Sequence, residues 1–163
     1  MQFEVRQTIA APVDRVVASL MSPAFYDTLA GVPGVSAPTL RDLNRDGDTV
    51  QLSLGFAFDG SLPSIARAVV DPDKLTWAVN LTVHLDGPNG PAAEFVVVPD
   101  HYADLMDGSG THRFVDGGSS TERVTNGELT VRVPLFGGKA EEAIVDGFRR
   151  YLLAEGDQLA VGG

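Results

Sequence analysis

Hydrophobic and polar residues alternate along most of the first 134 residues, and this period of two is typical of half-buried β-strands. The clearest alternation runs from Thr49 to Phe58, where even-numbered positions are apolar and odd-numbered positions are mainly small or polar. A second apolar face runs from Leu75 through Trp77 to Leu85. The pattern predicts seven strands, at residues 2–9, 35–45, 49–58, 75–85, 95–98, 102–116 and 121–134.

Helical spacing occurs in two places. Two short helices are predicted directly after the first strand, one beginning at Pro12 and the next at Ser22-Pro23, because proline is favoured in the first helical turn. A long helix is predicted from near Lys139 to the end of the chain, with its apolar face at the positions i, i+4, i+8 that such helices bury. The predicted face comprises Ala140, Ile144, Gly147, Phe148, Tyr151, Leu152, Glu155 and Leu159.

Glycines interrupt the last two strands, and the apolar positions change parity near them. Apolar residues are odd-numbered before Gly108 and even-numbered after Gly110, and a similar change follows Val124 in the last strand. We therefore predict glycine bulges that bend the sheet, with Gly127 opposite Ser109. The alternative is a hairpin turn at Asp107-Gly108, which needs no bulge.

This order of elements defines a fold class. Because short connections and turns such as Asp46-Gly47 and Gly117-Gly118 link successive strands, the sheet is expected to be antiparallel. One long amphipathic helix after seven strands needs a broad sheet to cover it. We predict an α+β helix-grip fold: a single domain over residues 1–163, with a strongly bent seven-stranded sheet wrapped around the C-terminal helix.

At this point the chain resembles the START-like superfamily, which includes the birch-pollen allergen and the polyketide cyclases. Within it, the chain is similar to an uncharacterised actinobacterial family through four segments, at residues 62–67 (LPSIAR), 75–77 (LTW), 110–114 (GTHRF) and 127–144 (GELTVRVPLFGGKAEEAI). The resemblance implies the helix-grip fold and an apolar ligand cavity between sheet and helix. It implies no single chemistry, because this fold hosts carriers, receptors and cyclases.

The charge and composition of the chain limit the classes of partner that it is expected to bind. The formal net charge of −10 and the scattered basic residues argue against nucleic acid as a partner. No apolar run is long enough to cross a bilayer, and the alternating N-terminus is predicted to be a strand and not a signal peptide, so we expect no integral membrane association and a cytoplasmic location. The chain has no cysteine, which excludes disulfides and thiol chemistry.

A hydrophobic or amphipathic small molecule, lipid or polyketide-like, is the expected ligand, held in a cavity between the sheet and the C-terminal helix. The residues predicted to line it are Leu54, Phe56, Phe58, Trp77, Val79, Leu81, His112, Phe114, Ile144, Phe148, Tyr151 and Leu152. The segment Gly60 to Val69 is the predicted mobile mouth of this cavity. The alternative is that the same side chains fill an ordinary packed core, leaving an interaction protein that works through its acidic surface or as a dimer.

Catalytic chemistry is the third hypothesis. A cyclase or dehydratase would use His112 and Tyr151 inside the cavity, since the other histidines, His84 and His101, fall on a polar strand face and in a turn. The spacing of the three histidines gives no metal motif, and the glycine pairs lack the lysine-serine pattern of a phosphate loop. We therefore predict no catalytic constellation, no metal and no cofactor.

Overall fold

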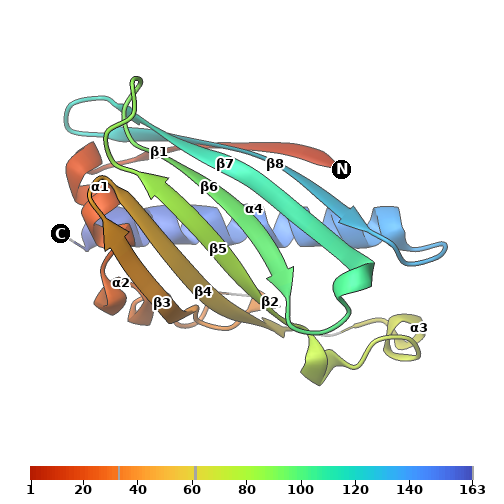
Figure 1. The fold of residues 1–163 in the computed structure, drawn as a ribbon. Coiled ribbons are helices and arrows are strands. Elements are labelled where there is room, and N and C mark those ends of the chain that lie inside the picture. The colour runs from red at the N-terminus through yellow and green to blue at the C-terminus, as the bar shows by residue number, and fades with distance from the viewer. Residues whose placement is uncertain (33, 61, 163) are drawn as a thin grey trace.

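An antiparallel sheet curves around one long helix in the computed structural model of the chain, which describes residues 1–32, 34–60 and 62–162 (Figure 1). The strands are β1 (Gln2–Ile9), β2 (Gly34–Val35), β3 (Thr39–Asp46), β4 (Thr49–Asp59), β5 (Thr76–His84), β6 (Ala92–Pro99), β7 (Met106–Asp116) and β8 (Thr121–Val131). The helices are α1 (Val13–Leu20), α2 (Pro23–Asp27), α3 (Ser64–Arg67) and α4 (Gly137–Val161), with short 3₁₀ turns η1 (Pro72–Lys74) and η2 (Ala103–Leu105).

The strand order confirms the predicted helix-grip fold. Strands β1, β8, β7, β6, β5 and β4 lie side by side in that order, and β3 and β2 both pair with the remaining edge of β4. The predicted strand at residues 35–45 is therefore divided into two pieces that share one strand position. A register shift between Leu40 and Asp42 places a bulge at Arg41 on this edge, a common site for bulges.

The predicted bulges near Gly108 and Gly127 are wrong, and so is the alternative hairpin turn at Asp107. Pairing between β7 and β8 runs without a shift from Met106↔Val131 to Asp116↔Thr121. Ser109 pairs with Glu128, while Gly110 faces Gly127. The buried positions of β7 are all even-numbered, so the strand keeps one face inward.

Two features of the structure explain why the apolar positions change parity in the sequence of these strands although neither strand changes its inward face. Ala103 and Leu105 belong to η2 and not to the strand, so their parity carries no information on β7. Val124 does belong to β8 and lies on the outer face, between Arg6 of β1 and Arg113 of β7, yet it is only 2% exposed. Long arginine side chains can cover an apolar neighbour with their methylene groups, so an outward valine is buried here.

The facing glycines of β7 and β8 make room for aromatic rings. A Cβ atom added at Gly110 would lie 2.5 Å from the Phe95 ring, and one added at Gly127 would lie 2.4 Å from the Phe3 ring. Both rings contact Phe148 of α4, with centroid distances of 5.7 Å for Phe3 and 5.8 Å for Phe95. Glycine is required at these positions because the rings occupy the place of its side chain, as does the Asn126 carbonyl oxygen, 2.2 Å from a Cβ at Gly110.

Helix α4 crosses the concave side of the sheet (Figure 1). Helices α1 and α2 lie at the end of the sheet where α4 ends. The buried positions of α4 are Val145, Tyr151, Leu152, Glu155, Gly156 and Leu159. The predicted face is thus correct from Tyr151 onward but wrong at Ile144, which is 41% exposed, whereas Val145 is 2% exposed. Within the described ranges, none of the helices is both long and apolar enough to span a membrane.

Candidate functional site

A cavity of about 50 Å³ lies between α4 and the concave face of the sheet, bounded also by α1 and α2. Its walls are mainly aliphatic and aromatic. Nine of the predicted ligand-binding residues line it: Leu54, Phe56, Val79, Leu81, His112, Phe114, Phe148, Tyr151 and Leu152. Most of the residues predicted from the sequence pattern to line a cavity therefore lie in the wall of this one.

Three predicted wall residues do not line the cavity. Trp77 pairs with Phe56 across β4 and β5 and stacks on it, with a centroid distance of 5.8 Å and nearly parallel rings, and so lies beside a wall residue. Phe58 lies near the end of β4, where its ring fills the space beside Gly60. Ile144 is largely open to solvent. Being on the correct strand face was not sufficient, because the cavity occupies only part of the length of β4 and β5.

The predicted mouth at Gly60 to Val69 is also away from the cavity. Apart from Ser61, which is outside the described residues, none of this segment contributes to the lining. Helix α3 lies beyond the end of the sheet that is opposite α1 and α2 (Figure 1). The wall residues on the helical corner are instead Val17 and Leu20 of α1, Met21, and Tyr26 of α2.

Several inward-pointing apolar side chains remain partly exposed. On the concave side of β5, Trp77, Val79 and Leu81 are only half-buried, and so is Phe148 of α4 opposite them. In a filled core these side chains would be covered. The space between α4 and β5 is therefore incompletely packed.

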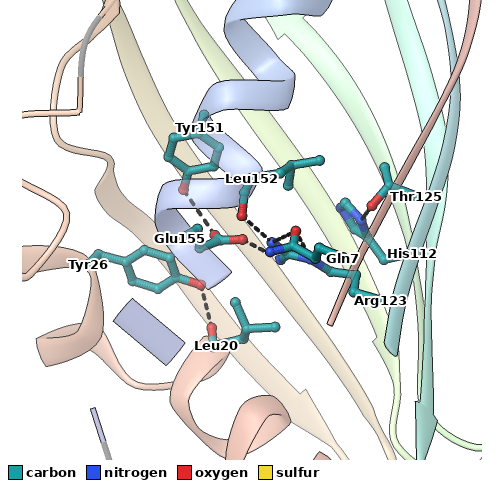
Figure 2. A network of polar contacts seen from close by, with 9 residues as sticks. All are labelled: Gln7, Leu20, Tyr26, His112, Arg123, Thr125, Tyr151, Leu152 and Glu155. Carbon is teal, nitrogen blue, oxygen red and sulfur yellow. Dashed lines mark hydrogen bonds and ion pairs between the residues drawn. The ribbon is translucent and has the colours of Figure 1, made fainter. Parts of the chain in front are cut away.

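One end of the cavity carries a buried ion pair (Figure 2). Arg123 of β8 and Glu155 of α4 form a salt bridge, with side-chain exposures of 2% and 6%. Arg123 also donates from Nε and Nη2 to Gln7 Oε1, at 3.1 and 2.7 Å, and from Nη2 to the Leu152 carbonyl at 2.8 Å. The charges of the pair cancel, and the additional hydrogen bonds offset part of the cost of removing them from water.

Two tyrosines flank this pair. The Tyr151 hydroxyl donates to Glu155 Oε1 at 3.0 Å, and the Tyr26 hydroxyl donates to the Leu20 carbonyl. Burial, followed by the charge of Glu155, raises the pKa of both phenols above the ordinary value. Both therefore stay protonated at neutral pH and keep donating to these acceptors.

His112 is a further polar wall residue. Its Nδ1 lies 2.7 Å from the Thr125 hydroxyl, and its ring stacks on Phe95 with a centroid distance of 4.9 Å. Burial and, second, the positive charge of Arg123 lower the pKa of His112 to about 3. The imidazole is therefore neutral at physiological pH.

Glycine at position 156 explains how Gln7 reaches the ion pair. A Cβ atom at Gly156 would lie 1.8 Å from Gln7 Nε2, so the amide passes over α4 only because this residue has no side chain. A second glycine, Gly147, also lies inside α4, where glycine costs about 1 kcal/mol relative to alanine. At Gly147 the nearest side-chain atom is 3.8 Å away, so no close neighbour among the described residues requires that glycine.

Sequence reasoning missed Gln7, Arg123, Thr125 and Glu155 as site residues. A signal was present in each case. Gln7 occupies an inward position of β1, Arg123 and Thr125 share the inward parity of Leu129, and Glu155 falls on the predicted apolar face of α4. A polar residue at a core position is the informative observation.

The chemistry that the cluster offers is hydrogen bonding in a site of balanced charge, surrounded by apolar walls. Among the described residues, no group of three or more histidine, aspartate or glutamate side chains is placed to bind a metal ion.

This sheet and helix form a helix-grip fold, which the chain shares with START-like structures. Similar structures include TTHA0849 from Thermus thermophilus (14% identity, TM-score 0.64, covering 100% of this chain and 99% of that one). The ZhuI aromatase/cyclase from Streptomyces sp. R1128 is similar at 16% identity with a TM-score of 0.61, covering 99% of this chain and 92% of that one. A START superfamily protein from Mycobacterium smegmatis is similar at 11% identity with a TM-score of 0.53, covering 94% of this chain and 92% of that one.

At these identities the similarity establishes the fold alone. The sequence itself matches a family profile over residues 4–160, and the chain belongs to that family, "Protein of unknown function (DUF2505)". The comparison with curated proteins gives no match.

Proposed function

We propose that this protein binds a hydrophobic or amphipathic small molecule between α4 and the concave face of the sheet. The observation that carries the proposal is a set of inward-pointing apolar side chains that are left half-buried: Val79, Leu81 and Phe148 in the cavity wall and Trp77 beside it. A binding site is typically an apolar concavity with a few polar groups that orient the ligand. The ion pair and His112 supply such groups at one end.

The size of the cavity sets a condition on this proposal. A volume of about 50 Å³ accommodates a few water molecules and is smaller than ordinary ligand pockets, which measure roughly 300–1,000 Å³. Ligand binding therefore requires the cavity to widen. Leu20 and Met21, at the junction of α1 and α2, are half-buried wall residues. Movement of this corner would enlarge the cavity without breaking a strand ladder.

The structure favours binding over catalysis. His112 and Tyr151 do line the same cavity, as the cyclase or dehydratase hypothesis requires. However, a general acid or base works best when its pKa lies near the working pH. The pKa of His112 is lowered to about 3 and that of Tyr151 is raised well above its ordinary value, so neither group exchanges protons readily at neutral pH.

Filling the cavity tests the proposal. We expect Val79→Trp, on the inner side of β5, to reduce binding of a hydrophobic fluorescent probe such as 1-anilinonaphthalene-8-sulfonate or a neutral analogue. The matched control is Val96→Trp on the outer face of β6, where the wild-type valine is 50% exposed and outside the cavity. Native mass spectrometry of the gently purified protein would show whether a small molecule is retained.

The two variants separate the hypotheses. Equal probe binding by Val79→Trp and the wild-type protein would show that the probe binds elsewhere, and the cavity proposal would fail. Absence of both a retained molecule and neutral-probe binding would favour the packed-core interaction protein instead.

A further inference from the structure

Hydrogen-bond donors around the cavity are nearly all paired with protein acceptors. The hydroxyl hydrogens of Tyr26 and Tyr151 are committed to the Leu20 carbonyl and to Glu155. A ligand therefore cannot receive a hydrogen bond from either tyrosine without breaking an existing one. The donors that remain define what a ligand must offer.

Arg123 retains one such donor. A guanidinium group has five N–H hydrogens. Nε and Nη2 use three of them on Gln7 and the Leu152 carbonyl, and Nη1 uses one on Glu155. Among the described residues, no acceptor is found for the second hydrogen of Nη1, and Arg123 lines the cavity.

His112 contributes the second donor, through its tautomer. Thr125 is 1% exposed, and within the described chain the hydrogen bond found for its hydroxyl is with His112 Nδ1. If Nδ1 carried the proton, the buried hydroxyl hydrogen of Thr125 would have no acceptor, which is costly. Thr125 therefore donates to Nδ1, and the proton of the neutral imidazole is on Nε2.

The Nε2–H group faces open space. No hydrogen-bond partner for Nε2 is found among the described residues, yet the described part of the chain contains no fully buried side-chain nitrogen or oxygen without a partner. Nε2 must therefore be accessible, and the cavity is the space that His112 lines. Arg123 lies close enough for its charge to act on His112.

We propose that the ligand is an uncharged carbonyl compound whose oxygen accepts hydrogen bonds from His112 Nε2–H and Arg123 Nη1–H. This inference rests on the proposed function and specifies its ligand class. Two donors in the wall of one cavity suit an oxygen that only accepts. The charges of Arg123 and Glu155 cancel and His112 is neutral, so a carboxylate would enter as an uncompensated buried charge, which is unfavourable. The apolar body of the ligand would lie along Val79 and Leu81.

Three probes of similar size separate the chemistry: acetophenone, which has a carbonyl; cumene, which replaces it with an apolar group; and benzoate, which is charged. Their dissociation constants are measured by NMR titration with the wild-type protein, with His112→Phe, and with the control His84→Phe, where the exposed histidine is on the outer sheet face. The ratio of acetophenone to cumene affinity is compared between proteins, because the different solvation of the free probes then cancels.

We expect His112→Phe to lower this ratio about tenfold, as loss of one net hydrogen bond predicts, and His84→Phe to leave it unchanged. We expect benzoate to bind most weakly. An unchanged ratio in His112→Phe, or preferential binding of benzoate, would overturn the carbonyl inference while leaving the cavity proposal intact. If neither acetophenone nor cumene binds, the cavity proposal itself fails.

A measurement on the wild-type protein keeps the inference testable should His112→Phe not fold. Nitrogen-15 NMR of the imidazole reports the tautomer directly. We expect a protonated Nε2 whose resonance shifts on addition of acetophenone but not of cumene. A proton on Nδ1, or equal shifts with both probes, would overturn the inference.

Discussion

Replacing Glu155 with alanine is the sharpest test of the buried polar cluster. The change leaves the Arg123 guanidinium, whose side chain is 2% exposed, without its counter-ion. Breaking a buried ion pair from one side costs about 3–5 kcal/mol. The Tyr151 hydroxyl also loses its acceptor, at a cost of about 1–3 kcal/mol. Since the two penalties overlap, we expect a loss of about 4 kcal/mol in the free energy of unfolding.

Two controls identify the source of that loss. Removing both charges, with Arg123→Met and Glu155→Leu together, leaves no uncompensated ion, although the Tyr151 hydroxyl still lacks its acceptor. The double variant should therefore be more stable than Glu155→Ala, recovering most of the cost of about 3–5 kcal/mol that the unpaired charge imposes. Asp146→Ala removes a carboxylate from an exposed pair on the same helix, in which Asp146 Oδ1 lies 3.9 Å from Arg149 Nη1. This surface change should alter stability by less than about 0.5 kcal/mol.

Equilibrium urea unfolding measures all three variants. Trp77 is the single tryptophan of the chain and stacks on the wall residue Phe56, so its fluorescence reports on the cavity, and far-ultraviolet circular dichroism provides the second probe. A loss below about 1 kcal/mol for Glu155→Ala would refute the burial of the pair. So would a double variant as unstable as the sum of its two single changes, because the charges would then not be coupled.

For three further changes, the structure predicts whether the free energy of unfolding rises or falls. Gly156→Ala should destabilise by about 1–3 kcal/mol because its Cβ collides with Gln7, whereas Gly147→Ala should stabilise by up to about 1 kcal/mol; thermal unfolding compares the pair, and equal effects would contradict the packing described. Because the pKa of His112 is lowered to about 3, the unfolded chain binds the extra proton, so stability should fall as pH drops from about 6.5 toward 3, by up to about 1.4 kcal/mol per pH unit. Urea midpoints between about pH 7 and about pH 5.5 check this, and an NMR titration of His112 near its ordinary pKa of about 6.5 would contradict it. Leu135→Gly should stabilise by up to about 1 kcal/mol in urea unfolding, since Leu135 has φ 68° and is 97% exposed; a loss of stability would mean that this side chain makes contacts.

The strands were predictable because each has two faces in different surroundings. Along β4, residues Val50 to Leu54 alternate between a buried inner face and a more open outer face, and the hydrophobic pattern records that difference directly. The rule failed at Val124, which is covered by long side chains on the outer face. Pattern reasoning equates apolar with inward, and it has no means of seeing that polar residues can bury an apolar one.

The cavity walls were largely predictable, but the limits of the cavity were not. Helix α4 offers apolar residues at both 144 and 145, and only its position on the sheet decides that Val145 is covered and Ile144 is not. The ion pair was less predictable still, because Arg123 and Glu155 are 32 residues apart and meet only once α4 is folded over the sheet. A single polar residue at a core position indicates that a partner exists without identifying it.

Burying the polar cluster of Gln7, Arg123 and Glu155 costs desolvation free energy, and a gain in folding stability does not account for the presence of these residues. Apolar residues of similar volume would fill the same space at no loss of stability, and often with a gain. Here β1, β8 and α4 each contribute a polar residue, Gln7, Arg123 and Glu155, that must meet the others for the burial to be tolerated. The aliphatic walls are interchangeable wherever total volume is preserved, whereas the directions of hydrogen bonds are not. For the ligand that we propose, we therefore expect selectivity among molecules of similar size to come from this cluster. The net charge of −10 is carried mainly at the surface and has no counterpart inside the cavity, where the charges cancel.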